Sequence, residues 1–409
     1  MHQRKPIEDA FVLIQDGRIL QIGKREGALI SKSIRRLELK NTMLMPGFIN
    51  THCHLEYGFL KNRVKYRGNF RNWLREIGEC SRQATRATVH QSVQQGIQQS
   101  LLYGTTTICD TSSTGISYQL LKNSPLRSIV LFELLEIGEA SSIGYWMKFQ
   151  DKLKTIIHAS STNSNVQWGL SPHTPFTVSS DILKILEKFS IKHQNLLVSM
   201  HISESREEKN FFKMGTGSIQ KRISKLNPQW RFPKSTTSIQ YLNRLGWLPK
   251  LDLAVHVNTG NHQDFWLISK NRIAVVHCPG SHSYFKHPKF PYSRARKSGV
   301  LVCIGTDSLA SNQSLSLFRE MYLFQKCYPT VTGFDILAMV TSRAAQAIGK
   351  GNILGQIRPG FLADIIGIPV SSQNDAPDQL YNEVIQYSKA VSFSMIQGEL
   401  QMRESLSSF

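Results

Sequence analysis

The sequence predicts an α/β protein whose main body is a (β/α)₈ TIM-type barrel, with a small β domain formed by both chain termini. Eight short apolar runs alternate with helix-like segments, which is the pattern of a parallel sheet closed into a barrel. Each end of the chain carries a hairpin signal. An open doubly wound sheet would normally carry a Gly-rich phosphate loop after an early strand. Neither G-x-G-x-x-G nor G-x-x-x-x-G-K-[ST] occurs in the sequence.

The two ends of the chain are predicted to fold together. In residues 11–22, two apolar runs flank Asp16-Gly17, a strong turn signal. Near the C-terminus, Gln397-Gly398 separates two further runs, and residues 363–368 add another strand. We assign residues 1–44 and 353–409 to this β domain and residues 45–352 to the barrel. The 409 residues leave room for both, because such a barrel takes about 250 residues.

The eight apolar runs are the predicted barrel strands. Each is short and apolar, and helix-like segments separate one from the next. In chain order they are LMPGFIN (44–50), GTTTICD (104–110), SIVLFEL (128–134), NVQWGLS (165–171), NLLVSMHI (195–202), LDLAVHVN (251–258), RIAVVHC (272–278) and GVLVCIGTD (299–307).

The composition excludes several classes of protein. With 41% hydrophobic and 19% charged residues, the chain is not disordered, collagen-like or a coiled coil. No apolar run reaches the ~18 to 20 residues of a membrane span or forms a signal-peptide core, so we expect a cytoplasmic protein. The six cysteines are widely spaced, which favours reduced thiols. The net charge of +20 leaves nucleic acid, anionic membranes and anionic small substrates open as partners.

Polar side chains lie at or near the ends of the predicted strands. His52 and His54 follow the first run, His201 lies in the fifth, His256 lies in the sixth, and Asp307 ends the eighth. Barrel active sites are built at the C-terminal strand ends, because the βα loops converge there. We therefore expect these five side chains around one mouth.

His52 and His54 are two residues apart on a strand, so both imidazoles point to one side and Cys53 points away. An isolated H-x-H pair is more often a surface accident, because a metal needs three or more converging ligands. Here a third His and an Asp come from other strand ends. This combination favours a metal site.

Glu204 has two interpretations. It lies three residues after His201, where it can belong to an ordinary helix start with Ser203 or Ser205 as the N-cap. Beside a metal held by His201, the same carboxylate lies within reach of a substrate atom and is a candidate proton shuttle.

A series of segments along the chain forms one recognisable pattern. They are PGFINTHCHLE (46–56), GTTTICD (104–110), SPHTPFTVS (171–179), HISESREE (201–208), AVHV (254–257), VVHCPGS (275–281), IGTDSLASN (304–312) and PGFLADI (359–365). In their order and spacing the sequence resembles the amidohydrolase superfamily, in particular its cytosine-deaminase-like branch of chlorohydrolases and aminohydrolases. The resemblance covers nearly the whole chain and implies a metal-dependent barrel flanked by a β-sandwich.

The resemblance also implies a ligand set. It makes His52, His54, His201 and Asp307 the ligands of one divalent metal ion, Zn²⁺ or Fe²⁺. The fourth run ends in SPHTP and offers no lysine of the kind that bridges two metals in other branches, which favours a single ion.

Catalytic roles follow from the same resemblance. Glu204 and Asp307 are the implied proton-transfer residues, and His256 would orient the metal-bound water. His277 is not a ligand in the family pattern, and we interpret it as a residue of the core or as a support of the ligands. The family commonly has Asn where this chain has His282, so we expect the substrate contact there to differ.

His173, Trp73 and Ser308 are the predicted substrate-binding residues. His173 resembles the family's substrate-contacting histidine, and a buried structural histidine is the alternative. Trp73 belongs to a basic segment, residues 61–75, which has three interpretations: a nucleic-acid patch, a solvated loop, or a partner for an anionic group on a small substrate. Nucleic-acid binding would not require the His, Glu and Asp constellation. We therefore expect no nucleic-acid partner and no membrane partner, and we leave a homodimer open.

The long stretch between Glu204 and the sixth run resembles an insertion in a subgroup that includes deaminases of 6-amino-6-deoxyfutalosine, an intermediate of the alternative menaquinone pathway. The resemblance implies hydrolytic release of ammonia from a 6-aminopurine nucleoside that carries a benzoate. The basic side chains of Lys61, Arg63, Lys65 and Arg67 are the expected partners of that carboxylate. The alternatives are S-adenosylhomocysteine, adenosine or guanine deaminases and related chlorohydrolases, which share the core motifs.

Overall fold

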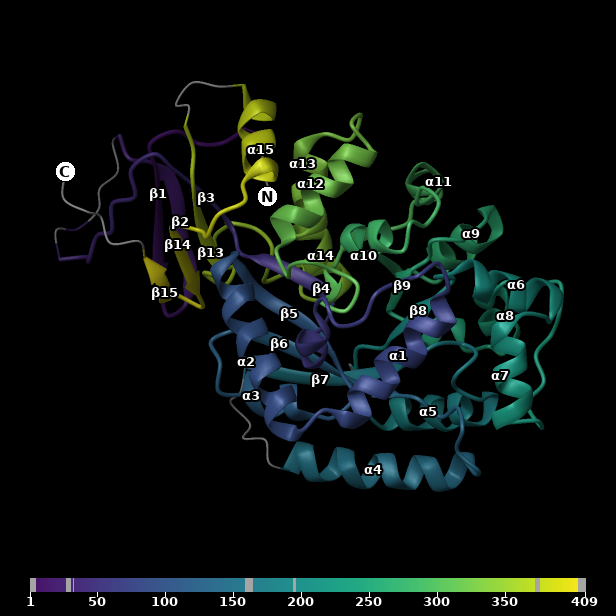
Figure 1. The fold of residues 1–409 in the computed structure, drawn as a ribbon. Coiled ribbons are helices and arrows are strands. Elements are labelled where there is room, and N and C mark those ends of the chain that lie inside the picture. Colours follow the sequence, from purple (N-terminus) through teal and green to yellow (C-terminus); the bar gives the residue numbers. More distant parts are fainter. Residues whose placement is uncertain are drawn as a thin grey trace.

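A computed structural model describes residues 5–26, 31, 33–158, 165–193, 196–371 and 376–403. Within these residues, parallel strands form a barrel covered by helices, and smaller antiparallel sheets lie beside it (Figure 1). Residues 1–4, 27–30, 32, 372–375 and 404–409 of the predicted sandwich lie outside the described residues. So does residue 195, the first residue of the fifth predicted strand.

The barrel consists of two parallel sheets, with strand orders β12-β4-β5-β6-β7 and β11-β10-β9-β8. A parallel bridge between Leu170 and Val198 joins them at one seam. At the other seam, the Thr306 N–H donates to the carbonyl oxygen of His52 at 3.0 Å. The predicted (β/α)₈ barrel is therefore confirmed. The strands are β4 (Phe48–His54), β5 (Thr105–Ser112), β6 (Arg127–Leu134), β7 (Val166–Pro172), β8 (Ser199–Ile202), β9 (Leu253–His256), β10 (Ala274–His277), β11 (Val302–Ile304) and β12 (Asp307–Ser308).

Two of the eight predicted runs each contain parts of two strands. The eighth run contains β11 and the start of β12. The first run contains the end of β3 (Thr42–Pro46), which belongs to a terminal sheet, and the start of β4. Gly47 separates these two strands, and a Cβ atom there would lie 2.1 Å from the Thr106 hydroxyl oxygen. The chain can pass this closely from one sheet to the other because residue 47 has no side chain.

Both predicted hairpins are confirmed. β1 (Ala10–Gln15) pairs with β2 (Arg18–Lys24), and β14 (Phe393–Ile396) pairs with β15 (Glu399–Arg403). The turn residues Asp16, Gly17, Gln397 and Gly398 all have positive φ. Two central residues in this conformation make the type I′ turn, whose twist matches the flanking strands.

The second terminal sheet has the order β15-β14-β13-β3, with β13 at Ile365–Pro369. It draws strands from both ends of the described chain. Ile19 of the β1-β2 hairpin and Phe393 of β14 share one hydrophobic cluster with Phe361 and Ile365. β3 runs across the predicted boundary between residues 44 and 45, and the division into a barrel and a β-sandwich domain stays a prediction.

Helices follow the barrel strands and cover their outer side, with α4 along one flank and α12, α13 and α15 packed together near the terminal sheets (Figure 1). The α-helices are α1 (Phe70–Gln83), α2 (Arg86–Leu102), α3 (Ile116–Leu121), α4 (Ser142–His158), α5 (Ser180–Lys192), α6 (Arg206–Met214), α7 (Ser218–Leu226), α8 (Ser238–Arg244), α9 (His262–Lys270), α10 (Pro279–Tyr284), α11 (Tyr292–Lys297), α12 (Leu317–Cys327), α13 (Gly333–Met339), α14 (Ser342–Ala347) and α15 (Pro377–Gln386). The 3₁₀ helices are η1 (Leu55–Leu60) and η2 (Leu248–Lys250).

Two further expectations concern the chain as a whole. All six cysteines are free thiols in the structure. Among the described helices, none combines the length and the apolar character that crossing a lipid bilayer requires.

Candidate metal centre and active site

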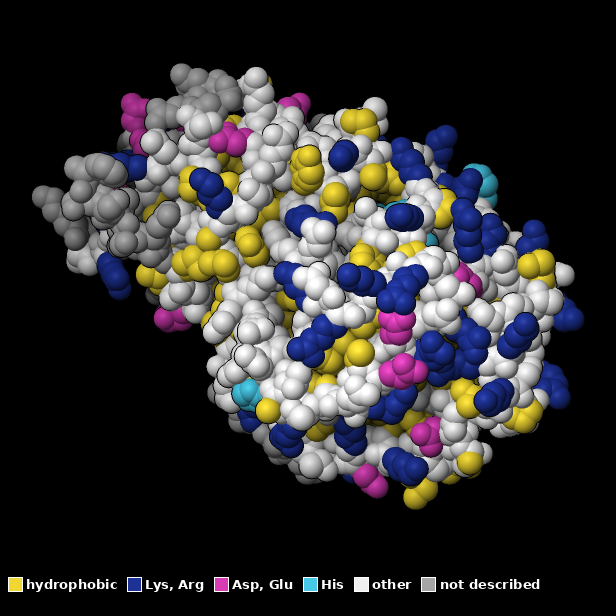
Figure 2. Space-filling view, viewed as in Figure 1, with side chains coloured by type: hydrophobic (Ala, Val, Ile, Leu, Met, Phe, Trp, Pro, Cys, Tyr) yellow, Lys and Arg dark blue, Asp and Glu magenta, His cyan; other side chains and the backbone are white. Residues whose placement is uncertain are grey.

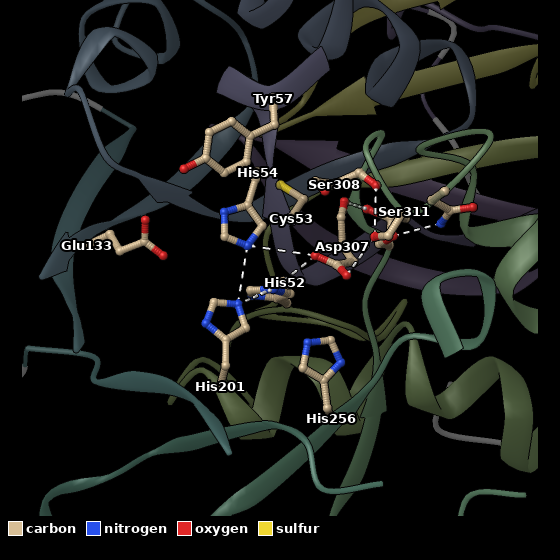
Figure 3. Close-up of polar contacts among 12 residues, drawn as sticks. His52, Cys53, His54, Tyr57, Glu133, His201, His256, Asp307, Ser308 and Ser311 are labelled. Atoms are coloured by element: carbon tan, nitrogen blue, oxygen red, sulfur yellow. Dashed lines mark hydrogen bonds and ion pairs between the residues drawn. The ribbon is translucent and has the colours of Figure 1, made fainter. Parts of the chain in front are cut away.

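Four candidate ligands converge at the C-terminal ends of the barrel strands (Figure 3). His52 and His54 end β4, His201 lies in β8, and Asp307 begins β12. All four side chains are buried. The structure therefore brings together residues that lie as much as 255 positions apart in the sequence.

A local irregularity in β4 turns both histidines inward. Ile49 belongs to the cluster inside the barrel, and strict alternation from it would turn His52 outward. The pairing of β4 with β5 is irregular between Asn50 and Cys53. Such an irregularity changes which side chains face the barrel interior, so His52 and His54 point inward. Cys53 points away from the histidines, as predicted, and its thiol faces the Cys109 carbonyl oxygen at 3.6 Å.

The spacing of the donor atoms fits one metal ion. His201 Nε2 lies 3.2 Å from His52 Nε2 and 3.3 Å from His54 Nε2, and Asp307 Oδ1 lies 3.7 Å from both His52 Nε2 and His54 Nε2. Four ligands at about 2.0–2.2 Å from a tetrahedral ion would lie roughly 3.3–3.6 Å from one another. Nitrogen and carboxylate donors in this arrangement are typical of Zn²⁺ and related divalent metals.

The protonation of the ligands also fits a cation. His201 Nδ1 lies 3.1 Å from the His173 carbonyl oxygen and donates to it, so Nε2 carries a lone pair directed at the other ligands. Burial, followed by the nearby His52, lowers the pKa of His201 to about 3, and burial likewise lowers the pKa of His54. Burial raises the pKa of Asp307, but the interactions with His52 and His256 outweigh burial and hold it well below the usual range. Neutral imidazoles and an ionised carboxylate are the forms that bind a metal.

Glu204 lies beside this cluster, in a strained turn after β8. The preceding residue, Ser203, has φ +53°, and His256 at the end of β9 has φ +74°. Glu204 Oε1 lies 3.6 Å from His256 Nε2. Burial raises the pKa of Glu204 well above its usual range, and Asp307 raises it further. Of the two predicted N-caps, Ser205 is the one that caps α6, so Glu204 precedes the helix.

Neighbouring side chains hold Glu204 by its backbone. The Glu208 carboxylate accepts from the backbone N–H groups of Ser203 at 2.7 Å and Glu204 at 2.9 Å. Asn258 Nδ2 donates to the Glu204 carbonyl oxygen at 3.1 Å, and Asn258 Oδ1 accepts from His282 Nδ1 at 3.1 Å. His282 therefore supports the residue that positions Glu204. The Glu204 carboxylate is left available for chemistry.

The predicted substrate-binding residues lie in different surroundings. His173 is half-buried, its ring centroid is 5.3 Å from that of His201, and Ser308 is buried next to Asp307. Trp73 packs instead in a separate hydrophobic cluster, where its ring centroid lies 4.6 Å from that of Phe285. Its role in substrate binding stays a prediction.

The interpretation of His277 as a core residue agrees with its surroundings. The ring is buried and stacks on Phe290, with ring centroids 4.2 Å apart and planes inclined by 12°. The backbone carbonyl oxygen of His277 accepts from the Gly305 N–H at 3.0 Å, next to the strand end that carries Asp307. The ring therefore packs in the core, and the backbone of His277 joins the end of β10 to the residue after β11.

Sequence reasoning missed Glu133, near the end of β6. Ile129 and Leu131 of the same strand point into the barrel interior, so alternation places Glu133 on that side, at the C-terminal end where the histidines lie. Figure 3 shows its carboxylate directed towards the space beside His54 and His201. The period-two pattern of the strand places Glu133 on the same side as Ile129 and Leu131, but it does not tell which side faces the barrel interior. A single Glu in an apolar run therefore gives no signal of its own.

Two buried carboxylates that the sequence analysis did not single out hold the segment after the ligands. Glu56 accepts from the Ser112 hydroxyl at 2.6 Å and from the Thr114 backbone N–H at 2.9 Å. Asp110 accepts from the Leu55 N–H at 2.7 Å. These contacts tie η1 to β5 and fix the direction in which β4 ends.

Known proteins match this chain over nearly its whole length. The profile of the amidohydrolase family matches residues 43–400. A 5-methylthioadenosine/S-adenosylhomocysteine deaminase of Symbiobacterium thermophilum is 24% identical, over 93% of this chain and 85% of its own length. An aminodeoxyfutalosine deaminase of Nitratiruptor sp. is 26% identical, over 89% of this chain and 88% of its own. The crystal structure of Helicobacter pylori aminofutalosine deaminase with methylthio-coformycin has the same fold, with a TM-score of 0.86 and 23% identity over 97% of this chain and 96% of its own.

Proposed function

This chain belongs to the amidohydrolase family, and from that premise we propose that it is a metal-dependent deaminase that hydrolyses the 6-amino group of a purine nucleoside. One observation carries the proposal: the carboxylate of Glu204 lies 3.6 Å from His256, beside four converging metal-ligand side chains. Relatives named as deaminases of adenine nucleosides match almost the whole length of the chain.

The proposed reaction converts a 6-aminopurine nucleoside and water into the 6-oxo nucleoside and ammonia. Lewis-acid activation of the attacking water is the chemistry that a divalent ion, Zn²⁺ or Fe²⁺, supplies when bound to His52, His54, His201 and Asp307. The carboxyl group of Glu204 donates a proton to the ring nitrogen next to C6, which makes that carbon more electrophilic. A second proton then passes through the same carboxylate to the departing amine.

We further propose aminodeoxyfutalosine as the preferred substrate, which would assign the enzyme to menaquinone biosynthesis. The relative from Nitratiruptor sp. supports this choice. A group of arginines on α1 and α7 supports it as well. Burial lowers the pKa of Arg222, and the nearby positive charges of Arg71 and Arg82 lower it further. Among the described residues no carboxylate forms an ion pair with these three arginines.

The arginine group lies near the candidate site. Burial and then Arg222 lower the pKa of His173 to about 4, and His173 neighbours His201. Figure 2 shows Lys and Arg side chains gathered over the part of the molecule where α1 and α7 lie in Figure 1. By contrast, the four side chains expected from the sequence to bind the carboxylate, Lys61, Arg63, Lys65 and Arg67, are all exposed. A half-buried arginine without a counter-ion is the stronger candidate for an anionic substrate group.

Ammonia release from a series of substrates tests the choice. We expect turnover of aminodeoxyfutalosine, S-adenosylhomocysteine, methylthioadenosine and adenosine, with the highest kcat/KM for aminodeoxyfutalosine and no turnover of guanine. If adenosine is turned over best, the assignment of aminodeoxyfutalosine fails although the proposed 6-aminopurine nucleoside deaminase stands. If guanine, which carries its amino group at C2 and has no sugar, is turned over best, the proposed nucleoside substrate fails as well and a metal-dependent deaminase of another substrate remains.

Replacing Arg222 by Gln is expected to lower kcat/KM for aminodeoxyfutalosine roughly ten- to a hundredfold, because a charge-assisted hydrogen bond is lost. Adenosine, which has no anionic group, should be affected little. The matched control is Lys221→Gln, a neighbouring exposed cation on α7. A second variant neutralises Lys61, Arg63, Lys65 and Arg67. If only this second variant loses discrimination between the two substrates, the exposed loop holds the carboxylate and Arg222 does not.

A further inference from the structure

Glu133 is a carboxylate in the candidate site that the proposed chemistry does not use. Its Oε2 accepts from the Ser113 hydroxyl at 2.5 Å, and that hydroxyl lies 3.1 Å from the Tyr57 hydroxyl. Oε1 has no hydrogen-bond partner among the described residues. The Tyr57 ring stacks on His54 with ring centroids 5.4 Å apart, so the carboxylate and the ring lie on the same side of the ligands.

Glu133 and the proton-transfer residues lie on different sides of the metal-ligand cluster. Figure 3 shows Glu133 on one side of His54 and His201, and Asp307 and His256 on the other. Glu204 lies with His256, at 3.6 Å. When the reacting atom of the substrate lies next to Glu204, the rest of the substrate extends towards the other walls of the site. Glu133 lies on one of these walls.

A second metal ion does not explain this carboxylate. Ligand atoms of Glu133, His173 and His201 lie within 4.8 Å of one another, which is the spacing of a metal site. However, His201 directs Nε2 at His52 and His54, and its Nδ1 donates to the His173 carbonyl oxygen at 3.1 Å. No lone pair of His201 remains for another ion. Glu133 and His173 alone are fewer than the three protein ligands that such a site needs.

The chemistry of the substrate class limits what Glu133 can bind. An ionised carboxylate accepts hydrogen bonds and does not donate them. The ring nitrogens of an adenine nucleoside are acceptors, and its reacting amino group lies at the site of proton transfer. The remaining donors common to all such nucleosides are the sugar hydroxyls.

We propose that Glu133, held by Ser113, positions the substrate by accepting a hydrogen bond from a ribose hydroxyl. This inference rests on the proposed function, because it requires a nucleoside substrate. Glu133 would thus help the site to select ribonucleosides. An analogue without the hydroxyl would leave the buried carboxylate without its hydrogen bond, and such a loss discriminates strongly against the analogue.

Sugar-modified substrates test the proposal. We would measure kcat/KM for adenosine, 2′-deoxyadenosine, 3′-deoxyadenosine and 2′,3′-dideoxyadenosine with the wild-type protein and with Glu133→Gln. The variant is expected to lose roughly ten- to a hundredfold on adenosine, the usual effect of losing a hydrogen bond to a charged acceptor, and less than about threefold on the dideoxy compound. The matched control is Glu139→Gln, a carboxylate six residues further on that pairs with Lys148 at 3.9 Å.

Each other outcome has a distinct meaning. An equal loss on all four substrates, or no loss on adenosine, would overturn the proposal, and so would a second metal ion that is present in the wild type and absent from Glu133→Gln. If Glu133→Gln does not fold, Glu133→Asp, which keeps the charge but shortens the reach, should lower the preference for adenosine over the dideoxy compound. An unchanged preference in that variant would count against a hydroxyl contact. If the wild type releases ammonia from no nucleoside, the proposed function itself fails.

Discussion

Glu204→Gln is expected to retain its bound metal and to lose about 10² to 10³ in kcat, the usual contribution of general acid–base transfer. Gln has the same shape as Glu but cannot deliver the proton to the ring nitrogen. The backbone at residue 204 should not move, because Glu208 and Asn258 hold it through its N–H and carbonyl groups. Steady-state ammonia release, together with metal analysis of the same samples, makes this measurement.

Glu207→Gln is the matched control for this variant. Glu207 lies in the first turn of α6, three residues after Glu204, and contacts the backbone N–H of Phe70 at 3.4 Å. We expect its kcat to remain within about threefold of the wild type, because Glu207 has the smallest effect of the charges that act on Glu204 and its own contact is with Phe70. Near-normal turnover in Glu204→Gln would show that Glu204 does not transfer the proton. The alternative interpretation, a carboxylate at an ordinary helix start, would then hold.

The double variant His52→Ala/His54→Ala should contain almost no metal and should lose at least about a thousandfold in kcat, because several kcal/mol of transition-state stabilisation come from the ion. Two of the four converging donors are removed, and two remaining ligands do not hold a divalent ion tightly. Elemental analysis of protein purified without added metal measures the occupancy. Circular dichroism establishes that the variant is folded.

His90→Ala is the control for the double variant, because His90 is exposed on α2. It should keep both the metal and the activity. Unchanged metal occupancy in His52→Ala/His54→Ala would show that the ion binds elsewhere and would remove the basis of the ligand assignment.

The sequence was sufficient to predict those parts of the molecule whose signal is local. Short apolar runs locate the barrel strands, because a buried parallel strand needs apolar residues on both faces. His52 and His54 are recognisable because their spacing is that of a strand. The resemblance to a known family added the role of His256. It also favoured one of the two interpretations that the local pattern had left open for Glu204.

Other features depend on contacts between distant segments and could not be predicted in this way. Arg222 lies on α7, and only the packing of that helix near α1 brings it to Arg71 and His173. Glu133 resembles any single carboxylate in a strand until the strand is placed in the barrel. The first predicted strand contained parts of two strands, because the close contact of Gly47 with Thr106 that separates β3 from β4 exists only in the folded chain.

Metal reconstitution tests the central claim most directly. Protein freed of metal by a chelator would be titrated with Zn²⁺ or Fe²⁺ while ammonia release from aminodeoxyfutalosine and from adenosine is followed. We expect no activity without metal and a linear rise that ends at one ion per chain, because His52, His54, His201 and Asp307 form one site. Full activity in the metal-free protein, or a rise that continues to two ions per chain, would contradict the account.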